Sequence, residues 1–317
     1  MRDTILFGDC RKTLCAFLPN SARMCVTSPP YYGLRNYGGE DYQIGLEESP
    51  EEYIRNLVEV FREVRNVLTE DGTLWLNIGD SYYNYRPGKG QALNKQTVSN
   101  SKQDLPDKCA RRGNKLDGLK EKDLIGIPWM LAFALRADGW YLRQDIIWHK
   151  PNPMPESVRD RCTKSHEYIF LLSKNKKYFY DHEAIKEPAK DWGTRDRSKG
   201  KYHNEGTGLQ PHSGLTKSYP TKNKRSVWSI TNKPYRGSHF AVFPPDLIEP
   251  CILAGSEKGD IVLDPFMGSG TTAMVSKKLG RDYIGCELHE DYGTLIKERV
   301  PDEEVSQETT INILDLI

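Results

Sequence analysis

Long apolar runs are missing from this sequence of 317 residues. Apolar runs such as 169–172 and 261–263 stop far short of the roughly 18 residues that a membrane span requires. The first nine residues include acids at positions 3 and 9 and contain no apolar core of signal-peptide length. These absences predict a cytoplasmic protein without membrane association.

Regular cysteine spacing is missing as well. The chain has seven cysteines, an odd number, and none of them belongs to a Cys-x-x-Cys pair. A disulfide framework needs an even number of cysteines, and a zinc site needs paired spacings such as Cys-x-x-Cys. We therefore expect reduced, mostly buried thiols and no bound metal.

Charge of one sign is not in excess over the whole chain, which has 45 Lys and Arg against 44 Asp and Glu. It is in excess locally: residues 84–122 carry ten basic and four acidic side chains, and residues 186–236 carry twelve and four. Neither segment shows a helical or strand period, so we expect long loops or a small irregular subdomain. Solvated loops are the plain interpretation. A phosphate-facing surface is the functional one, because aromatic rings are interleaved with the Lys and Arg of 186–236.

Strand and helix signals alternate along the rest of the chain. Short apolar runs predict strands at 5–7, 24–26, 73–78, 142–148, 166–172, 261–266 and 283–288. Helical periodicity predicts helices from Ser49-Pro50 to a stop at 71–72, and over 127–137, 245–254 and 271–279. Glu52 is placed to close a capping box with Ser49. This alternation is typical of an α/β protein whose mostly parallel sheet has helices on both faces.

Two glycines stand between the last predicted helix and the strand before it, in the string Asp264-Pro265-Phe266-Met267-Gly268-Ser269-Gly270-Thr271. Such glycines let a ligand approach the helix N-terminus, and an acid at the tip of the next strand, Glu287, can accept ribose hydroxyls. No Lys follows the glycines, which disfavours a nucleoside triphosphate. Asp264 before the glycines and Glu287 after the helix place an acid at each end of this unit. Two acids favour S-adenosylmethionine, which carries ribose and a cation, over NAD. The alternative is a turn that only packs a helix on a sheet.

The string Ser28-Pro29-Pro30-Tyr31 follows the predicted strand at 24–26. Two consecutive prolines fix an extended, rigid turn. Such a turn can present the Ser28 hydroxyl and the Pro29 carbonyl as acceptors beside the ring of Tyr31. These groups fit a planar exocyclic amine stacked on the ring, with its lone pair aimed at a methyl donor. The alternative is an ordinary Pro-Pro turn with a core tyrosine.

The two strings together resemble the DNA methyltransferases that modify exocyclic amino groups, N4 of cytosine or N6 of adenine. The hallmarks of that family are Asp, Asn or Ser before Pro-Pro-aromatic, and a Phe-x-Gly-x-Gly cofactor loop, here Phe266 to Gly270. The catalytic loop comes first in this chain, as in the circularly permuted β-type subgroup. The resemblance implies the Rossmann-like fold of S-adenosylmethionine-dependent methyltransferases, with a seven-stranded, mostly parallel sheet.

The resemblance also implies a set of site residues. Ser28, Pro29, Pro30 and Tyr31 are the expected catalytic residues, and Asp9 resembles the acidic contact to the cofactor's adenine. The remaining expected cofactor-binding residues are Asp264, Phe266, Gly268, Gly270, Thr271 and Glu287. Segments 148–153 and 165–168 resemble those around the target-base pocket, and 239–245 resembles the segment over the methionine end of the cofactor.

On the same basis the chain divides into three parts. Residues 1–174 are the expected catalytic half with the basic insertion 84–122, residues 175–238 the target-recognition region, and residues 239–317 the cofactor-binding half. We expect contacts to DNA from four basic side chains: Arg35, Lys222, Lys224 and Arg225.

The expected activity is site-specific methylation of one flipped base in double-stranded DNA. Ser at the first hallmark position favours N4 of cytosine, and N6 of adenine is the alternative. The resemblance leaves open a restriction endonuclease partner and a homodimer, and implies a bacterial or phage-infected cell, with the enzyme at the nucleoid.

Other functions are weighed against particular residues. A cytosine-C5 methyltransferase needs a cysteine nucleophile, but Pro250-Cys251 lies in a predicted apolar helix, where a buried structural cysteine is expected. A non-catalytic nucleic-acid binding module on this fold is expected to lose Ser28, Tyr31 or the glycines, and all are present. RNA or protein amino groups remain alternative substrates.

Overall fold

The computed structural model describes residues 1–33, 43–83, 116, 118–189, 220–232 and 243–300. Arg35 lies outside these residues, as do most of the insertion 84–122 and most of the basic segment 186–236. No helix among the described residues combines the length and the apolar character that crossing a membrane requires.

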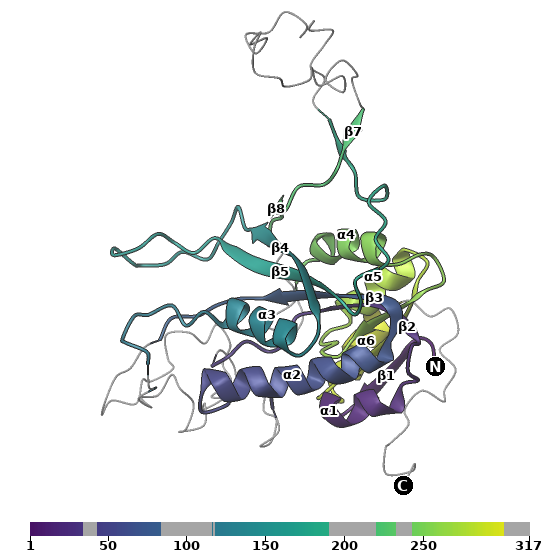
Figure 1. Ribbon diagram of the computed structural model, residues 1–317, viewed down its shortest axis with the longest axis horizontal. Coiled ribbons are helices and arrows are strands. Elements are labelled where there is room, and N and C mark those ends of the chain that lie inside the picture. The colour runs from purple at the N-terminus through teal and green to yellow at the C-terminus, as the bar shows by residue number, and fades with distance from the viewer. Residues whose placement is uncertain (34–42, 84–115, 117, 190–219, 233–242, 301–317) are drawn as a thin grey trace, which may run out of the picture.

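The elements alternate as the sequence predicts (Figure 1). The strands are β1 (Thr4–Phe7), β2 (Ala22–Thr27), β3 (Leu68–Ile78), β4 (Tyr141–His149), β5 (His166–Ser173), β6 (Glu187–Pro188), β7 (Thr221–Lys222), β8 (Val227–Ser229), β9 (Ile261–Asp264) and β10 (Asp282–Glu287). The helices are α1 (Cys10–Thr13), α2 (Pro50–Val67), α3 (Ile127–Ala137), α4 (Pro245–Gly255), α5 (Thr271–Lys278) and α6 (Tyr292–Arg299), with a 3-10 turn, η1, at Leu14–Ala16.

The main sheet has the strand order β1-β10-β9-β2-β3-β5-β4-β8. All neighbouring strands in it are parallel except β5, which is antiparallel to β3 and β4. The prediction of seven strands is wrong by one, because β8 adds a short strand along β4. A strand of three residues is too short to give a periodic signal in the sequence. The other seven strands are those that the sequence predicts.

Helices cover both faces of the sheet, as predicted (Figure 1). On the central strand β3, Leu74 and Leu76 pack with α2 and α3, while Trp75 between them packs with α4. All three side chains have no exposed surface. The alternation follows from the two-residue period of a strand, which points successive side chains to opposite faces.

The start of α2 agrees with the sequence better than its end does. The Ser49 hydroxyl accepts from the Glu52 N–H at 3.2 Å, but the Glu52 carboxylate accepts from the N–H of Glu48 and not from that of Ser49. The helix ends at Val67 and not at 71–72, because Leu68 already pairs with β2 and is fully buried. Burial between strands therefore outweighs the helical period here.

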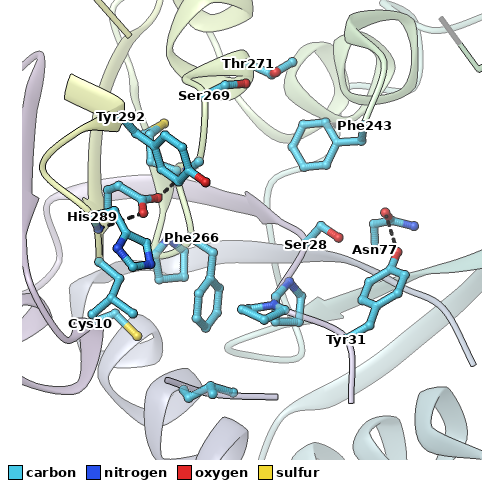
Figure 2. Close-up of a pocket in the computed structure, with 18 of the residues that line it drawn as sticks. Cys10, Ser28, Tyr31, Asn77, Phe243, Phe266, Ser269, Thr271, His289 and Tyr292 are labelled. Carbon is cyan, nitrogen blue, oxygen red and sulfur yellow. Dashed lines mark hydrogen bonds between the residues drawn. The ribbon is translucent and has the colours of Figure 1, made fainter. Parts of the chain in front are cut away.

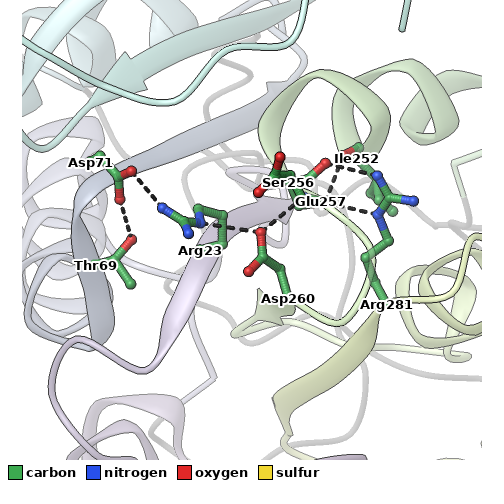
Figure 3. A network of polar contacts seen from close by, with 8 residues as sticks. All are labelled: Arg23, Thr69, Asp71, Ile252, Ser256, Glu257, Asp260 and Arg281. Carbon is green, nitrogen blue, oxygen red and sulfur yellow. Dashed lines mark hydrogen bonds and ion pairs between the residues drawn. The ribbon is translucent and has the colours of Figure 1, made fainter.

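A polar network joins the amino ends of the strands (Figure 3). The guanidinium of Arg23, on β2, donates to Asp71 at 2.5 Å and to Asp260 at 3.1 Å. Arg281 donates to the Ser256 carbonyl at 2.7 Å and to its hydroxyl at 3.2 Å. These contacts tie β2, β3 and the α4–β9 turn together at the end of the sheet opposite the Ser28 turn.

Candidate active site

The loops that follow the carboxyl ends of the strands enclose one cavity of about 430 Å³ (Figure 2). Most of the predicted site residues line it: Asp9, Ser28, Pro29, Pro30, Tyr31, Phe266, Gly268, Thr271 and Glu287. The fold thus brings together two strings that are more than 230 positions apart in the sequence. The two predicted cofactor-binding residues that do not line the cavity are Asp264 and Gly270.

Glu287 ends β10 on the cofactor side of this cavity. One carboxylate oxygen accepts from the Gly268 N–H at 2.7 Å, and the other accepts from the His289 N–H at 3.0 Å. Gly268 has φ of +56°, a conformation that favours glycine. Burial of Glu287, whose exposed fraction is 7%, raises the pKa of its carboxyl from 4.5 to about 7.

Asp264 lies behind the cofactor loop, with an exposed fraction of 1%. Its carboxylate accepts from the hydroxyls of Thr27 and Thr272, both at 2.6 Å, and from the Phe266 N–H at 3.0 Å. Burial raises the pKa of Asp264 to about 6. Asp264 therefore joins the end of β2, beside Ser28, to the cofactor loop and α5, and its predicted part in cofactor binding stays a prediction.

Gly270 likewise supports the loop from behind. Its φ is +77°, and a Cβ at this position would lie 3.1 Å from side-chain atoms of Ile296 on α6. Close packing of α6 therefore favours glycine at this position.

Asp9 caps α1 and lies on the cavity wall. Its carboxylate accepts from the Arg11 N–H at 3.0 Å and forms an ion pair with the Arg11 guanidinium at 2.7 Å. The charge of Asp9 is therefore balanced within the protein. Among the described residues, no Lys or Arg lies within ion-pair distance of Glu287 or Asp264.

The opposite wall of the cavity is a hydrogen-bonded cluster around Glu167 on β5. The Tyr31 hydroxyl donates to Glu167 at 2.8 Å and lies 3.3 Å from the side-chain oxygen of Asn77 (Figure 2). The Asn77 amide donates to the Tyr168 carbonyl at 3.1 Å and lies 3.4 Å from the Glu167 carboxylate. Lys150, at the end of β4, pairs with the other Glu167 oxygen. Burial, and next the negative charge of Glu167, raise the pKa of Tyr31 well above its usual value, so its phenol stays a neutral donor.

The Ser28-Pro29-Pro30-Tyr31 turn is fixed from two further elements. The Tyr53 hydroxyl, on α2, donates to the Pro30 carbonyl at 2.8 Å. A Cβ on Gly79, after β3, would lie 2.6 Å from the Tyr31 ring, so the glycine makes room for it. No described residue donates to the Pro29 carbonyl. The two predicted acceptors, at Ser28 and Pro29, therefore line the cavity beside an immobilised ring.

Sequence reasoning alone missed several residues of this site. Asn77 carries a detectable signal, because it is a polar side chain in an apolar strand and its exposed fraction is 4%. His289 and Tyr292 follow β10 and line the cofactor side, where burial lowers the pKa of His289. No local pattern in the sequence marks these two residues as cofactor-binding.

The cysteine beside proline is a structural residue, as predicted. Cys251 lies within α4 with an exposed fraction of 1%, and its thiol donates to the Leu247 carbonyl at 3.5 Å. Burial raises the pKa of this thiol well above its usual value. Cys251 does not line the cavity, so it offers no thiolate to a target base.

The predicted DNA-contacting residues that the structure describes lie apart from the cavity lining. Lys222, Lys224 and Arg225 approach the Glu187 carboxylate at 3.9, 3.7 and 3.4 Å, at the base of the β6–β7 ribbon. That ribbon projects from the body of the molecule (Figure 1).

Comparison with known proteins identifies the class of enzyme to which this site belongs. The DNA methylase family of N6 and N4 methyltransferases matches residues 22–298, and the chain belongs to this family. The chain is 49% identical over 296 residues to the Type II methyltransferase M.SmaI of Serratia marcescens, covering 93% of this chain and 90% of that protein. It is 45% identical to the Type II methyltransferase M.Cfr9I of Citrobacter freundii, covering 96% and 89%.

Two solved structures share the fold. The PvuII DNA methyltransferase (cytosine-N4-specific) superimposes with a TM-score of 0.61 at 18% identity, covering 96% of this chain and 88% of that one. The putative DNA modification methylase TTHA0409 of Thermus thermophilus, in complex with S-adenosyl-L-methionine, gives 0.58 at 25% identity and covers 94% of both chains. The predicted methyltransferase fold is confirmed, and the chain is a DNA methyltransferase that modifies either N4 of cytosine or N6 of adenine.

Proposed function

We propose that this enzyme transfers a methyl group from S-adenosylmethionine to N4 of one cytosine in double-stranded DNA. The observation that carries the proposal is that the Ser28 turn and the Gly268 loop open onto the same cavity. A cofactor on one wall and a flipped base on the other would meet in that cavity. A base must leave the duplex to reach it, which makes base flipping part of the mechanism.

The residues on the cofactor wall fit S-adenosylmethionine. The Glu287 carboxylate has no cation partner among the described residues, and it can accept ribose hydroxyls while it balances a cationic ligand. His289 adds a buried ring nitrogen, Nε2, with no hydrogen-bond partner among the described side chains. The bound cofactor supplies an electrophilic methyl group.

The residues on the target wall prepare the amine. Tyr31 stacks on the base. Its hydroxyl is fixed by the hydrogen bond to Glu167, and Gly79 leaves room for its ring. The Ser28 hydroxyl and the Pro29 carbonyl accept the two N–H bonds of the exocyclic amine. This draws the nitrogen away from conjugation with the ring and turns its lone pair toward the cofactor side.

The target base is tested by digesting modified DNA to nucleosides and separating them by mass spectrometry. We expect N4-methylcytosine, because family members with Ser at the first hallmark position most often modify cytosine. Ser28 and Pro29 would hold the amine of adenine in the same way. N6-methyladenine without methylcytosine would therefore overturn the assignment of the base and leave the mechanism intact.

The target-recognition region is proposed at 175–238, between the two halves of the catalytic domain, as in the permuted β-type subgroup. Lys222, Lys224 and Arg225 contact phosphate there, because they share one carboxylate, Glu187, among three cations. Each contacted phosphate contributes a slope of about 0.9 in log affinity against log salt. Replacing the three with Gln should flatten that slope without changing cofactor affinity, and an unaltered slope would move the surface elsewhere.

The same proposal concerns a restriction endonuclease as partner, pairing with a second copy of this chain, and the place in the cell where the enzyme acts. A Type II methyltransferase protects DNA from an endonuclease of the same specificity, so such an enzyme is the expected partner in the cell. The enzyme acts in the bacterial cytoplasm at the nucleoid. Analytical ultracentrifugation with and without duplex DNA distinguishes a monomer from a homodimer.

A further inference from the structure

The connection between β4 and β5 presents an exposed methionine at the rim of the cavity. Met154 has an exposed fraction of 79%, the largest among the exposed large apolar side chains in the described part of the chain. It nevertheless contributes to the cavity lining. Single exposed apolar residues are common on protein surfaces. Met154 differs from these because its backbone is restrained and because it lies beside the cavity.

The segment that carries Met154 is held in place. Prolines flank it on both sides, at 153 and 155, and they restrict its backbone. The preceding Asn152 makes two hydrogen bonds to the backbone of Asn232: its amide donates to the Asn232 carbonyl at 3.1 Å and its oxygen accepts from the N–H at 3.0 Å. Met154 is therefore displayed by a restrained turn.

The later part of the connection is braced as well. Arg161 pairs with Glu156 at 2.6 Å, and its guanidinium lies 3.8 Å from the centre of the Tyr82 ring. Residues 150–164 include four basic and two acidic side chains. The connection projects beyond the body of the molecule (Figure 1). A braced, net basic projection suits an approach to a polyanion.

The position of Met154 fits the target side of the cavity. Trp148 on β4 and Lys150 just after it line the same cavity, as does Glu167 on β5. Glu167 is the residue that holds the hydroxyl of Tyr31. Met154 thus stands at the rim on the wall where a flipped base would stack.

We propose that Met154 is a wedge that enters the base stack of duplex DNA where the target base has left it. Several DNA-binding proteins insert apolar side chains, Met among them, between the base steps of a duplex. The space that a flipped base leaves behind is apolar above and below, and a flexible thioether can fill it. The inference rests on the proposed base flipping, and it adds the residue that keeps the flipped state open.

The test compares single-turnover methylation of two duplexes that contain the DNA sequence methylated by the wild-type enzyme. One is fully paired, and the other has a mismatch opposite the target base, which makes that base easier to flip. Met154→Ala should slow methylation of the paired duplex by about tenfold or more, and of the mismatched duplex by about twofold or less. Met154→Leu should retain most of the rate on both, because it keeps a large apolar side chain.

Leu18 provides a matched control. It is a large apolar side chain with an exposed fraction of 67%, and it lies after η1, away from the cavity lining. Leu18→Ala should leave both rates unchanged. Cofactor affinity, measured by calorimetry, should be the same in all variants, which separates a wedge from a defect in the cofactor wall.

Two results would overturn the wedge while the proposed function stands. An equal loss on both duplexes would show that Met154 only supports the structure of the cavity. Wild-type rates of Met154→Ala on the paired duplex would show that it contributes nothing to flipping. If the wild-type enzyme methylated neither duplex, the proposed function itself would fail, and the wedge with it.

Discussion

Carboxylates lie at both ends of the sheet, part-exposed at the amino ends and buried at the carboxyl ends, and their partners differ. At the amino ends, Asp71 and Asp260 share the guanidinium of Arg23. At the carboxyl ends, Asp264 and Glu287 are held only by hydroxyls and backbone N–H groups among the described residues. Burial raises the pKa of both of these carboxyls, to about 6 and about 7.

This difference distinguishes acids that stabilise the fold, at the amino ends, from an acid that is available to a ligand, Glu287, at the carboxyl ends. An acid paired with Arg is satisfied inside the protein and contributes to folding. An acid held only by neutral donors has lost part of its hydration without a compensating charge, and this costs stability. Such an acid can recover that cost when a cationic, hydroxyl-bearing ligand binds. We infer that the uncompensated charge of Glu287, which lines the cavity, is part of the cofactor site.

The largest effect is expected from filling the cofactor loop. Gly268→Val introduces a branched side chain at φ of +56° on the cavity wall and displaces the N–H that holds Glu287. S-adenosylmethionine affinity should fall by about a hundredfold or more in calorimetry. Gly259→Val is the matched control, because Gly259 has φ of +82° and open space around its Cβ position.

Both valine variants carry the same kind of backbone strain, but Gly259 does not line the cavity. Both should therefore lose stability in thermal unfolding, while only the first should lose the cofactor. Equal affinities in the two folded variants would contradict the assignment of the loop.

The next largest effect concerns the target wall, where cofactor affinity should not change. Ser28→Ala removes an acceptor for the amine and should slow single-turnover methyl transfer by about ten- to a hundredfold. Tyr31→Phe keeps the ring but loses the bond to Glu167, and it should cost less than Tyr31→Ala, which also removes stacking worth about 1–3 kcal/mol. Near wild-type rates in the Ser28 and Tyr31→Ala variants would return the turn to a structural role.

At the amino ends the expected effect is on folding alone. Arg23→Ala leaves Asp71 and Asp260 without their shared cation and should lower the free energy of unfolding by about 1–2 kcal/mol, because all three side chains are part-exposed. Arg2→Ala is the control, because Arg2 pairs with Asp282 from an exposed position and should cost less than about 1 kcal/mol. Denaturant titration measures both. A change in cofactor affinity in Arg23→Ala would show that the two ends are coupled.

The two ends also differ in how far the sequence predicts them. The Ser28 turn and the Gly268 loop are local patterns, and each could be predicted because proline and glycine restrict or free the backbone in a known way. That both open onto one cavity followed from the resemblance to a family and not from the spacing. The contact of Asp264 with the hydroxyl of Thr27, 237 residues away, gives no local signal.

Long-range polar pairing could not be predicted at the amino ends either. Arg23 is 48 residues from Asp71 and 237 from Asp260, and charged residues of both signs occur throughout the chain. The sequence placed β2 and β9 as strands, but it did not specify which carboxylates would meet the guanidinium. The end of α2 failed for a related reason, because pairing of Leu68 with β2 is a tertiary effect.

The smallest expected effect, and the most direct test of the comparison, is the pH dependence that Glu287 gives to the enzyme. Its folded pKa of about 7 lies above its ordinary value of 4.5. Between these values the folded state binds more protons than the unfolded state, so Glu287 makes the free enzyme less stable as the pH rises from about 4.5 to 7. Asp264 acts in the same direction at lower pH. Glu287→Gln removes this titration, so its unfolding temperature should change less between pH 5 and pH 8 than that of the wild type.

Cofactor binding should have the opposite dependence. In the proposed binding mode it is the ionised Glu287 that accepts ribose hydroxyls and balances the cation, so binding below pH 7 must first displace its proton. With a pKa of about 7, the affinity of the wild type for S-adenosylmethionine should fall about tenfold from pH 8 to pH 6. Glu287→Gln should bind about tenfold more weakly at pH 8. It should show only the dependence that comes from the cofactor's own amino and carboxyl groups. Calorimetry at the two pH values measures both, and parallel pH curves for the two proteins would show that Glu287 is not the group whose charge the cofactor compensates.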